Sequence, residues 1–211
     1  MSSKATQSLY IRNPCDRLLA DRSAKVNTLL SEDELKRMEI ERERQLKDES
    51  FKYDHNSPIL HNEVNTFAGL KYFPVDAKYR FKVQLQKHPS PEVTSIMTST
   101  GAQKKYLRYG FFEFSLDGKL HRLEVFKSVH AHGTEEPLFI PFRDRPSGFE
   151  TYGAARYIDI PENEQGIYEL DFNKAYNPYC AYNQNYVCPI APRENWLDVE
   201  IRAGEKVFVE H

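Results

Sequence analysis

The sequence predicts a mainly β protein, an antiparallel barrel or sandwich with an N-terminal helix. Aromatic residues make up 13% of the 211 residues, a density typical of sheet-rich cores. From Asn65 onward, short apolar runs alternate with turn residues, as in an all-β domain. An apolar content of 40% is enough for one substantial core, so we expect one domain with an extension.

The N-terminal part should divide into an arm and a helix. Residues 1–30 are weakly patterned and predict a partly ordered arm. Ser31-Glu32-Asp33-Glu34 has the pattern of a capping box, so a helix should begin here and run to about Ser50. The charged helix and a linker are expected to occupy residues 31–62, and the β domain residues 63–211.

The predicted helix carries only a thin apolar stripe. Leu35, Met38 and Leu46 form this stripe, and acidic and basic residues alternate over the remaining surface. We therefore expect a solvated helix that lies on the sheet surface. A helix that binds a protein partner is the alternative.

The β domain should contain about ten short strands, a number that favours a barrel or sandwich whose edges are closed or covered. Candidate strands are Leu70–Phe73, Tyr79–Leu85, Val93–Thr98, Leu107–Leu116, Lys119–Phe126, Leu138–Phe142, Thr151–Ile160, Ile167–Phe172, Asp198–Arg202 and Lys206–Val209.

Asp117-Gly118 gives the clearest local signal, because this dipeptide favours a type I′ turn between two strands. Counting outward from the turn places Phe112 opposite Leu123 on the apolar face. On the other face Glu113 should oppose Arg122 as a cross-strand ion pair.

A second hairpin is predicted around the turn at residues 161–166. If the turn is symmetric, Ile160 faces Ile167 and Arg156 faces Asp171. An arginine fork beside an aspartate can hold a carboxylate or phosphate group through two hydrogen bonds. The alternative is an ion pair that only sets strand register.

Two long segments carry a family resemblance. LFIPFRDRPSGFETYGAARYIDI, followed by LDFNKAYNPYCAYNQNYVCPIAPRENWLDVEIRAGEK, resembles the family called domain of unknown function 1684. The resemblance extends upstream through FAGLKYFPVDAKYRF and covers roughly residues 50–208. It implies little about function, since no activity holds for the family as a whole.

The loop after Asp171 is rich in polar side chains on a β scaffold, which is a common setting for binding sites. We predict a pocket that binds a small polar or anionic molecule, with Arg156 as anion anchor and Asp171 as its orienter. The surrounding shell is expected to contain Tyr152, Asn173, Tyr176, Asn177 and Glu205.

Other readings stay open. An enzyme with hydrolytic or proton-transfer chemistry would use the same pocket, with Asp171 or a cysteine as the reactive group, and whether the protein is an enzyme is uncertain. A third reading makes the helix at residues 31–50 an interaction element on a structural domain. The sequence contains no standard nucleotide-binding, serine hydrolase or zincin motif.

Cys180 and Cys188 lack the spacing of zinc or C-x-x-C redox motifs, and only His130 and His132 could add ligands. We expect no metal and no cofactor, and leave open whether the two cysteines pair. The net charge of −2, with 29 basic and 31 acidic residues, predicts neither nucleic acid nor membrane as a partner. The N-terminus lacks the apolar core of a signal peptide, and the odd number of cysteines fits a reducing compartment, so a cytoplasmic location is expected.

Overall fold

The structure, a computed structural model, describes residues 30–129 and 136–208. The predicted arm, apart from its last residue, and the pair His130 and His132 lie outside the described residues. The chain divides into two compact units, Met1–Glu39 and Ile40–His211. The packing described below is that of the second unit.

Helix α2 (Glu32–Tyr53) begins with the predicted capping box. The backbone N–H of Ser31 donates to Glu34 Oε2 at 2.8 Å, and the N–H of Glu34 donates to Ser31 Oγ at 3.3 Å. These two bonds satisfy donors that the first helical turn leaves unpaired. The predicted helix start is confirmed.

The predicted apolar stripe on α2 is wrong. Met38 is 55% exposed and Leu46 is 48% exposed, whereas Ile40 and Phe51 are buried. Ile40, Arg44, Lys47 and Phe51 recur at the helical repeat and therefore share one face. The buried face of α2 thus has apolar residues at its two ends and basic residues between them.

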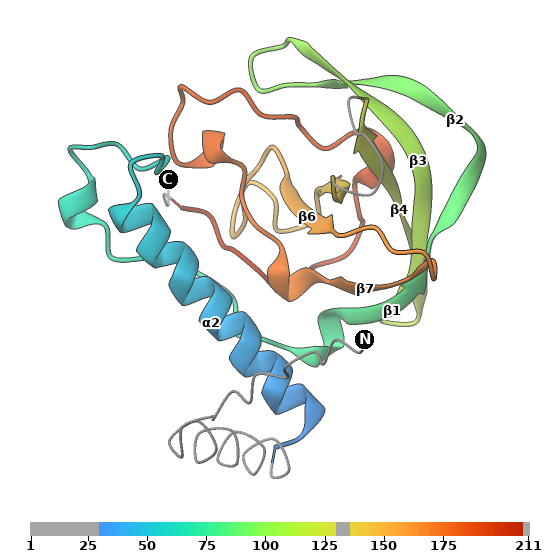
Figure 1. Ribbon diagram of the computed structural model, residues 1–211, viewed down its shortest axis with the longest axis horizontal. Coiled ribbons are helices and arrows are strands. Elements are labelled where there is room, and N and C mark those ends of the chain that lie inside the picture. The colour runs from blue at the N-terminus through green and yellow to red at the C-terminus, as the bar shows by residue number, and fades with distance from the viewer. Residues whose placement is uncertain (1–29, 130–135, 209–211) are drawn as a thin grey trace, which may run out of the picture. The chain divides into compact units, whose positions relative to one another are not determined.

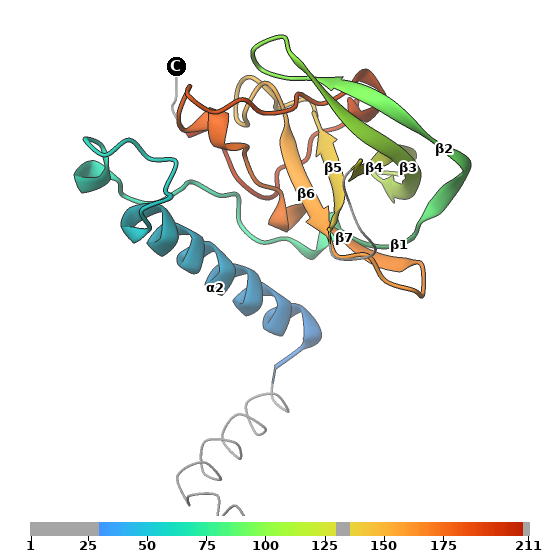
Figure 2. The same ribbon diagram turned by 45° about the horizontal axis from the view of Figure 1, so that its top comes forward.

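Seven strands form two antiparallel sheets in the part of the chain that the structure describes (Figures 1 and 2). The five-stranded sheet has the order β2-β3-β4-β5-β6, and the smaller sheet pairs β1 with β7. The strands are β1 (Arg80–Gln84), β2 (Gln86–Met97), β3 (Gln103–Leu116), β4 (Lys119–Ser128), β5 (Leu138–Phe142), β6 (Arg156–Ile160) and β7 (Ile167–Asp171). Short 3₁₀ helices lie at Val64–Thr66, Ala77–Tyr79, Phe172–Lys174, Tyr179–Ala181 and Arg193–Asn195.

A mainly β fold with an N-terminal helix is therefore confirmed. A closed barrel is not, because β2 and β6 form the two edges of the larger sheet and do not pair. One apolar core contains residues of both sheets, among them Val83, Leu170, Phe112, Leu123 and Ile140. No helix in residues 30–129 and 136–208 has the length and apolar character needed to cross a bilayer.

The Asp117-Gly118 hairpin has the predicted register. Both turn residues have positive φ, 51° and 75°, as a type I′ turn requires. Phe112 pairs with Leu123 and Glu113 pairs with Arg122. The side chain of Arg122, however, donates to Glu124 at 2.6 Å instead of to Glu113.

The predicted hairpin between β6 and β7 is wrong. Arg156 in β6 lies opposite Phe142 of β5, and Asp171 in β7 lies opposite Arg80 of β1. The free edge of β6 is taken by the chain after β7, because Tyr157 exchanges backbone hydrogen bonds of 2.8 and 3.0 Å with Tyr176. Both edges of β6 are thus occupied, and β7 joins the other sheet.

Three predicted strands do not form, at Leu70–Phe73, at Asp198–Arg202 and in the described part of Lys206–Val209. Single contacts hold these segments, such as the bridge between Tyr72 and Glu205 and the 2.9 Å bond from Phe73 N–H to Gly204 O. Gly204 has a φ of +74°, and a Cβ there would lie 2.5 Å from Ala175 O. This close approach bends the C-terminal segment away from a regular ladder.

The hairpin register makes one stability prediction. Phe112→Ala should lower the free energy of unfolding by about 3 to 5 kcal/mol, because it leaves a cavity in the core. Glu113→Ala should cost less than about 1 kcal/mol, since its carboxylate contributes one exposed hydrogen bond, from Gln86. Denaturant unfolding measures both, and equal losses would contradict the assignment of the two faces.

Candidate functional site

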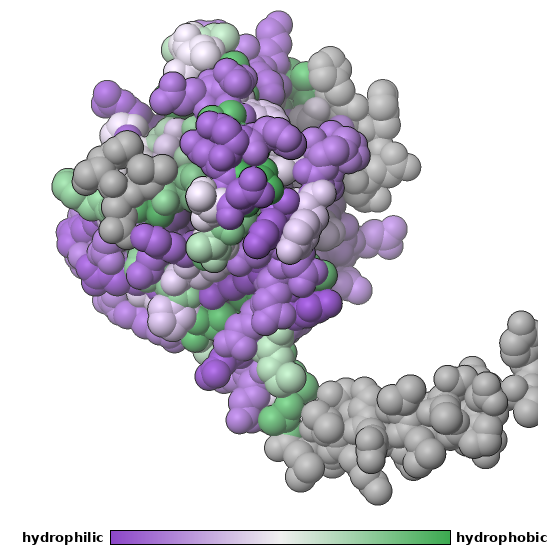
Figure 3. All heavy atoms as spheres, turned by 90° about the vertical axis from the view of Figure 1, so that its left-hand side faces the viewer, coloured by the Kyte–Doolittle hydropathy of each residue, from purple (hydrophilic) through white to green (hydrophobic). Residues whose placement is uncertain are grey.

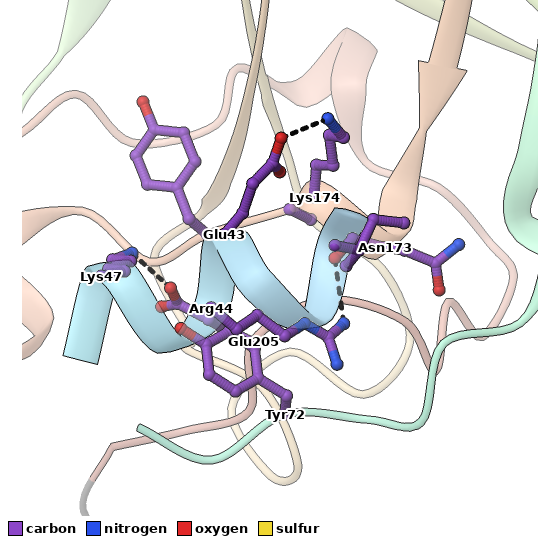
Figure 4. A pocket seen from close by; sticks show the side chains of 10 residues that line it. Glu43, Arg44, Lys47, Tyr72, Asn173, Lys174 and Glu205 are labelled. Carbon is purple, nitrogen blue, oxygen red and sulfur yellow. Dashed lines mark hydrogen bonds and ion pairs between the residues drawn. The ribbon is translucent and has the colours of Figure 1, made fainter. Parts of the chain in front are cut away.

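A cavity of about 160 Å³ lies where the buried face of α2 meets the loop after β7 and the C-terminal segment (Figure 4). Its walls combine apolar groups with three basic and two acidic side chains. The lining residues are Ile40, Glu43, Arg44, Lys47, Tyr72, Asn173, Lys174, Ala175, Tyr176 and Glu205.

Arg44 forms the centre of one wall. Its guanidinium donates to the carbonyls of Phe73 at 2.8 Å and Asn173 at 3.1 Å, and it stacks 4.5 Å from the ring centre of Tyr72. The Nε–H of Arg44 is buried and has no hydrogen-bond partner among the described residues. Arg44 thus brings to the cavity a positive charge with a donor still free.

Tyr72 provides a second unpaired polar group in the same wall. Its hydroxyl is buried and lacks a hydrogen-bond partner within the described part of the chain. Burial, with further contributions from Glu205 and Asp48, raises the pKa of Tyr72, so the hydroxyl stays protonated and able to donate. A buried polar group without a partner costs free energy. The cavity therefore favours an occupant that accepts hydrogen bonds.

Glu205 is only 1% exposed and is held from three sides. Its carboxylate pairs with Lys47 and accepts the hydroxyl of Tyr182, and it accepts the backbone N–H of Asn177 at 2.9 Å. The ammonium of Lys47 also lies 5.1 Å from the ring centre of Tyr176. Glu205 is therefore a fixed acceptor that positions Lys47 at the cavity.

Among the described residues that line the cavity, three side chains are basic and two are acidic. Lys174 pairs with Glu43 at 2.8 Å, and Lys47 pairs with Glu205 (Figure 4). The remaining charge belongs to Arg44, whose hydrogen bonds go to neutral carbonyls. Burial lowers the pKa of Arg44, with carboxylates at longer range opposing it. An anion that enters the cavity would compensate this charge directly.

Arg156 lies behind the cavity wall and is 1% exposed. Its guanidinium donates to Asp144 Oδ2 at 3.0 Å, to Ile201 O at 2.8 Å, and to the carbonyl of Ala203. A longer bond of 3.3 Å reaches the carbonyl of Glu205. The partner of Arg156 is thus Asp144 and not the predicted Asp171, and the arginine fixes the backbone that carries Glu205.

Asp171 supports the loop after β7. Its Oδ1 accepts the backbone N–H and the side-chain amide of Asn173, at 2.9 and 2.8 Å. Asn173 in turn exchanges two bonds of 2.9 Å with the backbone of Asp76. Burial raises the pKa of Asp171, and the bonds from Asn173 oppose that effect. The aspartate thereby sets the conformation of a loop that lines the cavity.

The structure brings together part of the predicted site. Asn173, Tyr176 and Glu205 line the cavity. Asn177 does not line it, but its backbone N–H donates to the carboxylate of Glu205. Tyr152 lies elsewhere, with its hydroxyl 3.6 Å from the sulfur of Cys180.

Sequence reasoning missed Arg44, Lys47 and Tyr72. The helical spacing of Ile40, Arg44, Lys47 and Phe51 was the available signal for two of them.

A second, larger depression of about 390 Å³ is lined by His88, Pro89, Ser90, Glu92 and Arg108. Behind it, the buried Glu124 accepts hydrogen bonds from Arg108 at 2.8 Å and Arg122 at 2.6 Å, and lies 2.8 Å from His88. Burial alone would raise the pKa of Glu124, but these bonds outweigh it and lower the pKa to about 2. The basic groups here already have a partner, which favours the smaller cavity as the candidate site.

Comparison with known proteins gives a family and a fold. The sequence matches the family described as "Protein of unknown function (DUF1684)" over residues 65–206. The fold is similar to the solution NMR structure of an uncharacterized protein from Haloarcula marismortui. The two share 32% sequence identity with a TM-score of 0.64, over 93% of this chain and 100% of that one. None of the curated proteins matches this chain.

The Glu124 cluster predicts a loss of stability in acid. Folding lowers the pKa of Glu124 from its ordinary value of 4.5 to about 2. The stabilisation that the ionised Glu124 gives to the fold is therefore complete above about pH 4.5 and is lost as the pH falls toward 2. Glu124→Gln should be less stable than the wild type at neutral pH and should lack this part of the acid decline. Denaturant unfolding at several pH values, with Glu113→Gln as control, measures the difference. Parallel curves for Glu124→Gln and the wild type would contradict the assignment.

The Arg156–Asp144 pair predicts a second pattern. Arg156→Leu should lower the free energy of unfolding by about 3 to 5 kcal/mol, because it leaves Asp144 buried and uncompensated. The double variant Arg156→Leu, Asp144→Leu should recover part of that loss, whereas Arg156→Leu, Asp171→Leu should not. Recovery with the Asp171 change instead would show that the pair is assigned wrongly.

Proposed function

The chain belongs to the DUF1684 family, and on that premise we propose that it binds a small anionic molecule in the cavity beside Arg44. The observation that carries this proposal is the pair of buried, unpartnered polar groups in one wall, Arg44 Nε–H and the Tyr72 hydroxyl. Both groups can donate a hydrogen bond, and Arg44 has no carboxylate hydrogen-bond partner among the described residues. A carboxylate or phosphate oxygen between them would satisfy both donors.

The size of the cavity limits the ligand. About 160 Å³ is well below the roughly 300 to 1,000 Å³ of sites for drug-sized molecules. It suits a single acidic group with a short carbon chain, for which Ile40, Ala175 and the ring of Tyr176 supply apolar contacts. We infer a compact carboxylate or phosphate and not a nucleotide.

Arg156 and Asp171 take new roles in this proposal. Arg156 positions the backbone at Glu205, and Asp171 holds Asn173, so that each shapes the cavity from behind. Arg44 takes the part of anion anchor, with Tyr72 and Lys47 beside it. Asn173, Tyr176 and Glu205 keep the parts that the sequence predicts for them in the shell.

The arrangement of the two sheets, the cellular location and the partners of the protein are also proposals. We propose that the two sheets face each other as a sandwich, since residues of both share one core. A cytoplasmic location and the absence of nucleic acid and membrane partners stay predictions. So does a protein partner at the helix of residues 31–50, where Met38 and Leu46 are exposed. On the face shown in Figure 3, hydrophilic residues cover most of the surface, which favours a local site for a polar molecule.

The test uses inorganic phosphate and short mono- and dicarboxylates as probes, with binding followed by calorimetry and by the rise in melting temperature. Arg44→Gln should weaken the binding of the preferred anion by about tenfold or more, because it removes a charge-assisted hydrogen bond. Tyr72→Phe should weaken it less. Arg42→Gln is the matched control, since Arg42 is an exposed arginine on the same helix.

Equal binding to wild type and Arg44→Gln would overturn the proposal. So would the failure of every probe to bind the wild type at millimolar concentration. The enzymatic alternative, with Asp171 or a cysteine as the reactive group, stays a prediction, and neither Asp171 nor a cysteine is among the residues that line this cavity.

A further inference from the structure

Cys180 and Cys188 are free thiols that lie close to each other and are not among the residues that line the cavity beside Arg44. Cys180 belongs to the 3₁₀ helix Tyr179–Ala181, and its backbone N–H donates to the sulfur of Cys188 at 3.4 Å. Both residues are half-buried.

The backbone holds Cys188 in place at the end of β2. Ser99 N–H donates to Cys188 O at 2.9 Å, and Cys188 N–H donates to Ser99 Oγ at 3.3 Å. The next residue, Pro189, forms a bridge with Thr98. The bonds to Thr98 and Ser99 therefore fix the backbone of Cys188, whose sulfur accepts the N–H of Cys180.

The surroundings of the two sulfurs differ. The hydroxyl of Tyr152 donates to the sulfur of Cys180 at 3.6 Å. The hydrogen bond from Cys188 is the largest contribution, and together with those from Tyr152 and Ser99 it outweighs burial and lowers the pKa of Cys180 to about 6. The same thiol contact and burial raise the pKa of Cys188. These surroundings favour the thiolate form at Cys180 and the protonated form at Cys188.

We propose that Cys180 and Cys188 form a redox-active pair, in which a hydroperoxide oxidises Cys180 and Cys188 then closes a disulfide with it. In the first step the Cys180 thiolate attacks the hydroperoxide, the O–O bond breaks, and the leaving oxygen takes a proton to give an alcohol, or water from hydrogen peroxide. Cys180 becomes a sulfenic acid. In the second step the sulfur of Cys188 loses its proton and attacks the sulfur of Cys180, and hydroxide leaves as water.

The overall change is a two-electron oxidation of two thiols, matched by reduction of one hydroperoxide. Tyr152 acts here as a positioning residue, because its donor stabilises the thiolate without taking part in bond exchange. This role accounts for a tyrosine that the sequence assigns to the ligand pocket and that lies outside the cavity lining. The proposal does not depend on the anion site.

The experiment uses the full chain with Cys15→Ser, so that Cys180 and Cys188 are the two remaining thiols. Iodoacetamide alkylation across pH, read by peptide mass spectrometry, should modify Cys180 about tenfold or more faster than Cys188 near neutral pH. Equimolar hydrogen peroxide should give the intramolecular Cys180–Cys188 disulfide, which dithiothreitol reverses. Cys188→Ser should leave a sulfenic acid on Cys180 that dimedone traps.

Tyr152→Phe keeps the ring and removes the donor. It should raise the midpoint of the Cys180 alkylation curve, whereas Tyr53→Phe, at a tyrosine that is 77% exposed, should leave it unchanged. Circular dichroism checks that each variant is folded, and Tyr152→Phe keeps the test valid if a cysteine variant unfolds. Equal alkylation rates for the two thiols, or reduced Cys180 and Cys188 after peroxide, would overturn the proposal.

Discussion

The rest of the site depends on the hydrogen bonds that the buried guanidinium of Arg156 donates. An arginine in the core requires a negative partner and further acceptors, and it finds them in Asp144 and in the carbonyls of Ile201, Ala203 and Glu205. Those carbonyls belong to a segment that forms no regular strand. Because Arg156 anchors this backbone together with the bond of 2.9 Å from Glu205 N–H to Ala175 O, the carboxylate of Glu205 takes a defined place beside α2.

Glu205 then organises the contact between the C-terminal segment and the helix. It takes the charge of Lys47 and the hydroxyl of Tyr182, and Phe51 packs at 5.0 Å against the ring of that tyrosine. Arg44, one turn earlier on the same face, donates to two carbonyls, and its Nε–H has no partner in residues 30–129 and 136–208. The two basic residues on this face of α2 thus differ in their partners. Lys47 pairs with the carboxylate of Glu205, whereas the hydrogen bonds of Arg44 go to carbonyls.

Features governed by near neighbours in the chain could be predicted from the sequence. The capping box at Ser31 and the turn at Asp117-Gly118 involve contacts over three residues or between adjacent strands, and residue type alone nearly determines their geometry. The β6–β7 hairpin failed for the opposite reason. The turn at residues 161–166 is compatible with pairing between β6 and β7. In the structure, however, β5 pairs with one edge of β6 and Tyr176 with the other, and no local sequence pattern shows which segments will pair with β6.

The residues that line the cavity also divide into those that local sequence predicts and those that only long-range packing places there. The loop after Asp171 was recognised from its own composition, and Asn173 and Tyr176 do line the cavity. Arg44 and Lys47 were missed because charged residues on a helix usually face solvent, and only long-range packing against Phe73 and Glu205 turns them inward. Asp144 lies in the loop two residues after β5 and outside any strand, so counting along the predicted β6–β7 hairpin could not find its pairing with Arg156.

The most direct test of this account follows the Nε–H resonances of Arg44 and Arg156 by NMR during titration with phosphate and short carboxylates. The account predicts that the Arg44 signal shifts with saturation while the Arg156 signal stays in place, because Arg44 lines the cavity and Arg156 is not among its lining residues. A saturable shift of Arg156 with Arg44 unchanged would contradict it and would restore Arg156 as the anion anchor.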